Sequence, residues 1–167
     1  MIRLEIPGWK PIELAHVVLD VNGTVTRRGQ LLEDVAVRIH ELKKHVDVRL
    51  ASADTFGTLS NVAAELGLEA QIAPDAASKL ELIEALGPAR TAHGGNGSND
   101  AAALRTAALG LAVLGPEGLS SAAFAAADVV CASVQDALDL LLDSQLLSAT
   151  SEARPATTRS WLTQDSR

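Results

Sequence analysis

The chain has 167 residues, of which 47% are hydrophobic, 21% are charged and only 2% are aromatic. This length and composition fit one folded domain with an aliphatic core, and they argue against global disorder and against a base-stacking platform for nucleic acids. The formal net charge of −7 works against non-specific binding to a phosphate backbone, although a local basic patch stays possible.

The sequence also narrows the cellular setting. Its single cysteine, Cys131, excludes an intrachain disulfide, and no Cys/His spacing typical of a metal cluster is present. The first residues lack the uninterrupted apolar core of a signal peptide, and the longest apolar stretch, 107–114, is far short of the roughly 20 residues that span a bilayer. We therefore expect a cytoplasmic protein that binds neither membranes nor nucleic acids.

Apolar runs and turn-forming residues alternate along the chain. Period-two or continuous apolar runs predict strands, and apolar residues at helical spacing predict helices. Ser133 and Asp136 resemble a capping box at a helix start. In chain order we predict a strand at 2–6, a strand at 17–19, a hairpin or flap at 25–32, a helix over 33–44, a strand at 46–51, a helix at 56–66 capped by Gly67, a strand at 68–72, a helix at 79–86, a weak strand at 89–93, a helix at 99–109 ending at Gly110, a strand at 111–114, a helix at 119–126, a strand at 129–132 and a helix at 134–142.

Strands that alternate with helices are typical of a parallel sheet covered on both faces. We predict an α/β fold with a Rossmann-like, doubly wound, mostly parallel sheet over residues 1–147. The polar segment 148–167 has no periodicity and is predicted to be a flexible C-terminal tail. The intervals 26–46 and 55–79 are too short for an inserted domain, so no cap domain is expected.

Polar residues follow the predicted strands at four places. They are the segment 20–26 (DVNGTVT), the segment 52–55 (SADT), Lys79, and the segment 94–100 (GGNGSND). In a doubly wound sheet, ligands bind beyond the carboxyl ends of the strands. A carboxylate there can bind a cation or attack phosphorus, a Ser hydroxyl and a Lys ammonium can hold phosphoryl oxygens, and a second carboxylate can orient Mg²⁺.

The order DxNGTxT, Ser, Lys and GNGxND resembles the haloacid dehalogenase (HAD) superfamily, whose usual pattern is DxDGTxT, Ser or Thr, Lys and GDGxND. The subgroup of soluble P-type-ATPase-like proteins is similar even in DxNGT, xADTFGT and GNGxND, which lie here at 20–24, 53–58 and 95–100. The resemblance covers roughly residues 2–147. It implies a capless, Mg²⁺-dependent phosphatase, that is, a phosphoric monoester hydrolase that forms an aspartyl-phosphate.

The resemblance also implies a role for each motif. Asp20 would be the nucleophile, and its carboxylate would bind Mg²⁺ together with the backbone carbonyl of Asn22. The phosphate oxygens would be held by Ser52, Lys79 and Gly23, and the metal-binding loop would contain Asn96 and Asp100.

Two residues depart from the usual pattern. Asn22 replaces the Asp that acts as general acid and base, and an amide cannot transfer a proton at ordinary pH. Because such catalysis is worth about 10²–10⁴-fold, we expect slow turnover. Asn96 replaces a metal-binding Asp, which predicts weaker Mg²⁺ binding. Asp54 is the one nearby carboxylate that could stand in for the missing acid, although a helix N-cap or turn role is the simpler interpretation.

The absence of a cap implies an open site. Such a site favours a large substrate, a macromolecular partner or a neighbouring subunit in a homo-oligomer. The substrate is expected to be a small phosphorylated molecule or a phosphorylated macromolecule, and Arg27 and Arg28 in the flap could contact an anionic substrate. Two alternatives stay open: a catalytically weak or inactive phosphate- and Mg²⁺-binding regulatory or interaction module, and a specialised biosynthetic enzyme that reuses Asp20. His93 adjoins the site, but a structural role is the simpler interpretation.

Overall fold

The computed structural model describes residues 1–150 of the chain. Its centre is a six-stranded sheet in the order β10-β9-β8-β3-β6-β7, in which every neighbouring pair is parallel. This arrangement confirms the predicted Rossmann-like α/β fold. The strands are β3 (His16–Asp20), β6 (Asp47–Ser52), β7 (Glu69–Ile72), β8 (Thr91–Gly95), β9 (Leu109–Val113) and β10 (Val129–Cys131).

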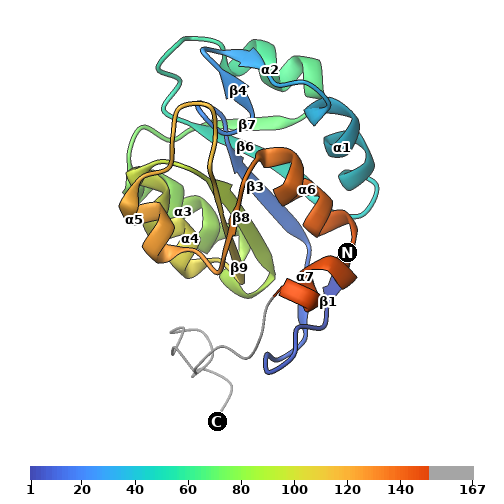
Figure 1. Cartoon of the computed structure of the whole chain (residues 1–167). Coiled ribbons are helices and arrows are strands. Elements are labelled where there is room, and N and C mark those ends of the chain that lie inside the picture. The colour runs from blue at the N-terminus through green and yellow to red at the C-terminus, as the bar shows by residue number, and fades with distance from the viewer. Residues whose placement is uncertain (151–167) are drawn as a thin grey trace.

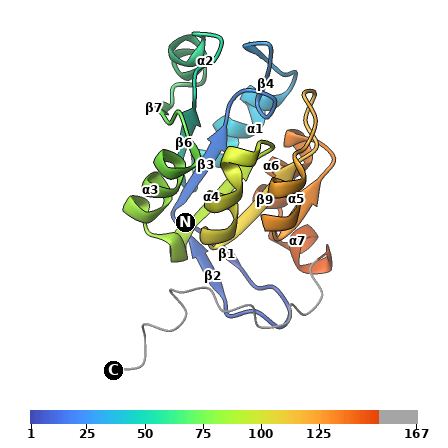
Figure 2. The same ribbon diagram turned by 90° about the vertical axis from the view of Figure 1, so that its left-hand side faces the viewer.

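Helices cover both faces of the sheet (Figure 1, Figure 2). The chain runs from β3 outward to β7 and then returns to build β8, β9 and β10 on the other side of β3. Because crossovers between parallel strands are right-handed, this change of direction moves the connecting helices to the opposite face. One layer contains α1 (Val35–Leu42), α2 (Leu59–Leu66), α6 (Val134–Leu142) and α7 (Ser144–Thr150), and the other contains α3 (Ala76–Leu86), α4 (Ala101–Thr106) and α5 (Ser121–Ala126).

The core is aliphatic, as the composition predicts. Strand β3 shows why its apolar run is continuous: Val17 and Leu19 pack into the larger core cluster, whereas Val18 packs into a second cluster with Ala51 and Leu82. A strand buried on both faces needs an apolar side chain at every position. Burying each such side chain stabilises the fold by about 1.5–3 kcal/mol.

Two small antiparallel pairs lie outside the main sheet. The flap predicted at 25–32 is confirmed as a hairpin of β4 (Thr26–Arg27) and β5 (Gln30–Leu31). Strand β1 (Ile2–Leu4) pairs with β2 (Ile12–Leu14), which the sequence analysis did not predict because three residues next to Pro11 are too few to show a period. Short 3₁₀ turns occur at η1 (Pro88–Arg90) and η2 (Ser98–Asp100).

The helix predicted at 99–109 was wrong at its end. Helix α4 ends at Thr106, and Gly110 lies inside strand β9 rather than at a helix cap. A Cβ atom on Gly110 would overlap the carbonyl oxygen of Leu104, so glycine is present because α4 packs closely on β9. Helix α2 begins at Leu59, which leaves Phe56 in the preceding turn. Gly67 does cap α2, in the left-handed conformation, and Ser133 caps α6 through the Asp136 N–H.

Neither interval considered for a cap holds an inserted domain, since β3 is joined to β6 by the flap and α1, and β6 is joined to α3 by α2 and β7. Within residues 1–150, no helix combines the length and apolar character needed to cross a membrane. Of the predicted tail, residues 148–150 belong to α7, and residues 151–167 lie outside the described part of the chain.

Candidate active site

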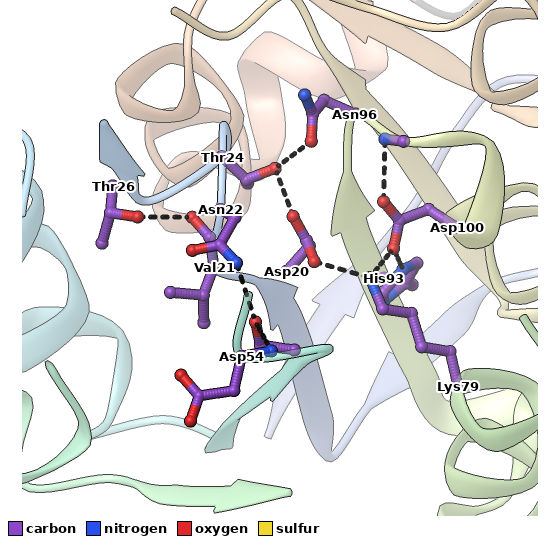
Figure 3. Close-up of polar contacts among 12 residues, drawn as sticks. Asp20, Val21, Asn22, Thr24, Thr26, Asp54, Lys79, His93, Asn96 and Asp100 are labelled. Atoms are coloured by element: carbon purple, nitrogen blue, oxygen red, sulfur yellow. Dashed lines mark hydrogen bonds and ion pairs between the residues drawn. The ribbon is translucent and has the colours of Figure 1, made fainter. Parts of the chain in front are cut away.

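The four sequence motifs meet at one edge of the sheet. Asp20 ends β3, Ser52 ends β6, and Gly95 ends β8, so all three lie at the carboxyl ends of parallel strands. Strand β3 sits between β6 and β8, at the point where the chain reverses its direction of winding. This topological switch point is where doubly wound sheets bind ligands. Figure 3 shows the polar side chains that converge there.

A buried lysine bridges two carboxylates. The ammonium of Lys79 donates to Asp20 Oδ1 at 2.5 Å and to Asp100 Oδ1 at 2.6 Å, and its side chain is fully buried. Lys79 reaches this position from the first turn of α3, which Asp75 caps by accepting the N–H of Ser78. Burial by itself would lower the pKa of Lys79, but the two carboxylates raise it above its ordinary value. The lysine is therefore a fixed cation, and two of its three N–H donors are used in these bonds.

The two carboxylates are not equivalent. Burial raises the pKa of Asp20 to about 6, and the charge of Asp100 acts in the same direction, against the effect of Lys79. Burial would also raise the pKa of Asp100, but its hydrogen bond with His93 and the charges of His93 and Lys79 hold that pKa at about 2. Asp100 is thus the permanent anion of the pair. Asp20 is ionised at neutral pH but is held at a higher free energy.

His93, which the sequence analysis placed beside the site without a chemical role, belongs to this cluster. Its Nε2 lies 3.0 Å from Asp100 Oδ1, and its side chain is fully buried. Its Nδ1 is buried and has no hydrogen-bond partner among the described residues. The backbone N–H of Gly97 donates to the other oxygen of Asp100 at 2.9 Å. A histidine two residues before the end of β8 was the available signal, since it had to lie beside the loop that carries Asp100.

Three oxygen atoms lie close together on the other side of Asp20. The Thr24 hydroxyl is 3.2 Å from Asp20 Oδ2 and 3.1 Å from Asn96 Oδ1. A hydroxyl has one proton, so it can donate to only one of these acceptors at a time. An excess of buried oxygen lone pairs fits a hard cation such as Mg²⁺. Within residues 1–150 no three His, Cys, Asp or Glu side chains gather as a metal cluster, so such a site would depend on amide and backbone oxygens.

Ser52 lies beyond Asn22, on the α2 side of the site. Its hydroxyl oxygen accepts the Asp54 N–H at 3.0 Å and makes a long contact of 3.4 Å with Asn22 Nδ2. Both interactions use lone pairs of the oxygen, so the hydroxyl proton can be donated to an anion. The Ser52 hydroxyl is therefore available as a hydrogen-bond donor.

Asp54 stabilises the turn that leads into α2. Its Oδ1 accepts the N–H of Leu59 at 2.9 Å, at the start of α2, and its backbone has a positive φ of 53°. Its carboxylate points away from Asp20 (Figure 3). This geometry matches the simpler turn-and-cap interpretation, and it does not favour Asp54 as a replacement acid. Arg27 and Arg28 are exposed on the flap.

Comparison with known proteins places this geometry in context. No family model matches the chain. The uncharacterized protein MJ0073 of Methanocaldococcus jannaschii is 47% identical over 57 residues, which are 34% of this chain and 61% of that protein. The chain thus matches less than two thirds of that curated relative.

Solved structures match over far more of the chain. The 3-deoxy-D-manno-octulosonate 8-phosphate phosphatase from Moraxella catarrhalis, solved with magnesium, phosphate and KDO, has a TM-score of 0.64 and 19% identity over 82% of this chain and 90% of its own. A putative HAD superfamily (subfamily III A) hydrolase from Legionella pneumophila has a TM-score of 0.61 and 17% identity over 81% and 86%. The chain has the fold of the HAD hydrolases.

A phosphoserine phosphatase, solved as a phospho-aspartyl intermediate analogue, shares this HAD fold with a TM-score of 0.64 and 14% identity over 78% of this chain and 98% of its own. At such low identities the likeness concerns the fold. The HAD-like sheet of this chain nevertheless brings Asp20, Thr24, Lys79, Asn96 and Asp100 together, and it places Ser52 next to Asn22.

Proposed function

We propose that this HAD-like chain is a slow phosphatase that hydrolyses phosphoric monoesters through an aspartyl-phosphate at Asp20. One observation carries the proposal: the Asp20 carboxylate lies at the switch point with a lysine on one oxygen and an oxygen-rich pocket beside the other. Two HAD-fold neighbours support it, since both are phosphatases and one was solved as a phospho-aspartyl intermediate analogue.

The proposed reaction has two steps. An Asp20 oxygen attacks phosphorus and the bond to the leaving-group oxygen breaks, giving the aspartyl-phosphate and an alkoxide. Water then attacks the same phosphorus, the bond to Asp20 breaks, and inorganic phosphate leaves while the water proton passes to solvent. Lys79 and Ser52 would hold the phosphoryl oxygens through both steps. The Gly23 N–H donates to the Thr26 carbonyl at 3.0 Å, so it would have to leave that bond to join them.

A divalent cation, which we take to be Mg²⁺, would be held by Asp20, the carbonyl of Asn22 and Asn96. When bound, it would neutralise charge on the phosphoryl group and favour the ionised carboxylate of Asp20. Both oxygens of Asp100 already accept hydrogen bonds, from Lys79, His93 and Gly97. We therefore assign Asp100 to holding Lys79 and the metal loop in place.

Asn22 is the reason to expect slow turnover. The leaving alkoxide must take its proton from solvent, because an amide is not an acid at ordinary pH. Applied to a typical turnover of about 10 s⁻¹, the loss of general acid–base catalysis predicts roughly 10⁻³–10⁻¹ s⁻¹. The same residue favours a second candidate, a phosphate- and cation-binding module without turnover.

For the substrate we propose a small phosphorylated molecule, with a phosphorylated macromolecule as the alternative. Arg27 and Arg28 would contact its anionic groups from the flap. Because the described chain has no cap over the site, a second copy in a homo-oligomer could cover it.

The test compares wild type with Asp20→Asn, using phosphate release from a panel of phosphomonoesters with Mg²⁺ and with EDTA. We expect Mg²⁺-dependent release that falls at least about 10³-fold in the variant. Asp34→Asn is the matched control, since Asp34 is exposed and its left-handed backbone also suits Asn. No release from any substrate, together with saturable vanadate binding, would overturn the phosphatase proposal in favour of the binding module.

A further inference from the structure

The turn between β9 and α5 lies directly against the nucleophile loop. A Cβ atom on Gly115 would overlap the carbonyl oxygen of Gly23, so the two backbones are in contact. The turn closes on itself through the Gly118 N–H, which donates to the Gly115 carbonyl at 3.0 Å. Neither Gly115 nor Glu117 belongs to the four motifs that the sequence analysis singled out.

The same turn is bonded to Asn96. The Asn96 amide donates from Nδ2 to the Gly118 carbonyl at 2.8 Å, and the Asn96 carbonyl accepts the Ser120 N–H at 2.9 Å. The turn is therefore attached at two points to the residue whose side-chain oxygen faces Thr24 and Asp20.

Glu117 extends from this turn to the flap. Its Oε1 accepts the backbone N–H of Arg28 at 3.2 Å, and its Oε2 lies 3.2 Å from the place where a Cβ of Gly23 would be. Arg28 has a positive φ of 51°, an uncommon conformation for a residue with a side chain, and it needs support from its surroundings. Figures 1 and 2 both show the loop between β9 and α5 rising beside β4.

On its other side the flap touches the segment before α2. A Cβ on Gly29 would come within 2.8 Å of the Thr58 side chain, so the flap tip fits closely between Thr58 and Glu117. Glu117 is the charged member of these contacts, and a carboxylate is a stronger acceptor for a backbone N–H than a neutral group.

We propose that Glu117 is a positioning residue that holds the flap β4–β5 over the phosphoryl site. It would act through the Arg28 N–H, without touching the reacting atoms. The effect on substrate rests on the proposed function: a released flap would present Arg27 and Arg28 less well to the leaving group. KM should therefore rise for bulky phosphomonoesters, while kcat stays close to that of the wild type.

The first experiment measures the flap itself and needs no activity. Native protein is treated with trypsin, and mass spectrometry follows cleavage after Arg27 and Arg28 in wild type, Glu117→Ala, Glu117→Gln and the control Glu81→Ala. Glu81 is exposed on α3, which covers the opposite face of the sheet from α1, the helix that follows the flap. We expect cleavage to be about three- to tenfold faster in Glu117→Ala only, since the Gln oxygen can still accept the N–H. Equal cleavage in all four proteins would overturn the proposal.

The second experiment is kinetic. A rise in KM of about threefold or more in Glu117→Ala, with kcat unchanged and Glu117→Gln restoring KM, would support the positioning role. A loss of kcat that is as large in Glu117→Gln as in Glu117→Ala would overturn it, because it would mean that Glu117 acts on the reacting atoms. If no substrate is turned over, the trypsin result still decides the flap contact, so the two proposals can fail separately.

Discussion

Asn22 and Asn96 each stand where the resemblance leads one to expect a carboxylate, yet their surroundings differ. Asn22 is half-buried, and its amide makes one long contact of 3.4 Å with Ser52. Asn96 is 9% exposed, with its Nδ2 bonded to the Gly118 carbonyl and its Oδ1 facing Thr24. Asn22 therefore contributes little to the packing, whereas the amide of Asn96 is part of it. A residue can depart from a pattern for chemical or for structural reasons, and its hydrogen bonds distinguish the two.

The largest effect is expected at Asn22. Asn22→Asp should raise kcat by about 10²–10⁴-fold, because a carboxyl group can give a proton to the leaving group and take one from water. Steady-state phosphate release with saturating Mg²⁺ measures it, and Asn61→Asp on the exposed face of α2 is the control. If kcat does not change, the missing acid is not what limits the rate. Asn22 would then have no chemical effect that sets it apart from Asn96.

The next prediction concerns Lys79, which forms ion pairs with Asp20 and Asp100. Lys79→Met keeps the volume of the side chain but leaves Asp20 and Asp100 buried without their cation. Removing one partner of a buried ion pair costs about 3–5 kcal/mol, and this loss should appear in the free energy of unfolding measured with urea. The exposed Lys10→Met should change it by less than about 0.5 kcal/mol. A Lys79→Met protein as stable as the wild type would contradict the role of this ion pair in stability.

The pH dependence should follow Asp20. Burial raises its pKa to about 6 from an ordinary 3.8, so the folded protein binds this proton more tightly than the unfolded chain does. The contribution of Asp20 to stability therefore falls as pH rises from about 4 to about 6, by up to about 3 kcal/mol. In EDTA, the difference in unfolding free energy between wild type and Asp20→Asn should decline over this window. Saturating Mg²⁺ should reduce the decline, and a difference that instead grows with pH would show that the pKa is lowered.

The smallest effect is expected at Asn96. In Asn96→Asp, a carboxylate oxygen takes the place of the amide N–H that donates to the Gly118 carbonyl. The loss of this hydrogen bond should lower the free energy of unfolding by about 1–3 kcal/mol in the absence of metal. Added Mg²⁺ should recover part of the loss, since the new charge strengthens cation binding. Thermal unfolding with and without Mg²⁺ measures both effects. An Asn96→Asp protein with unchanged metal-free stability would mean that the two asparagines do not differ as the structure suggests.

The amino-acid sequence alone predicted the fold class and most of the residues that gather at the candidate site. Apolar periods are local, so a continuous run such as 17–19 identified a strand buried on both faces, and Gly67 and Ser133 marked helix ends that the structure confirms. Because parallel strands end at one edge, the sequence alone assigns the polar residues after several strands to one site.

The tertiary structure alone decided which side chains meet. His93 contacts Asp100, Gly110 makes room for α4, and Glu117 bonds to Arg28, a residue 89 positions earlier in the chain. Such contacts depend on how elements pack after they form, and no local period in the sequence encodes them. The same is true of the two asparagines, which both precede glycine in the sequence. Only their neighbours in space show that Asn22 can be replaced by Asp without losing a close contact, whereas the amide of Asn96 is part of the packing.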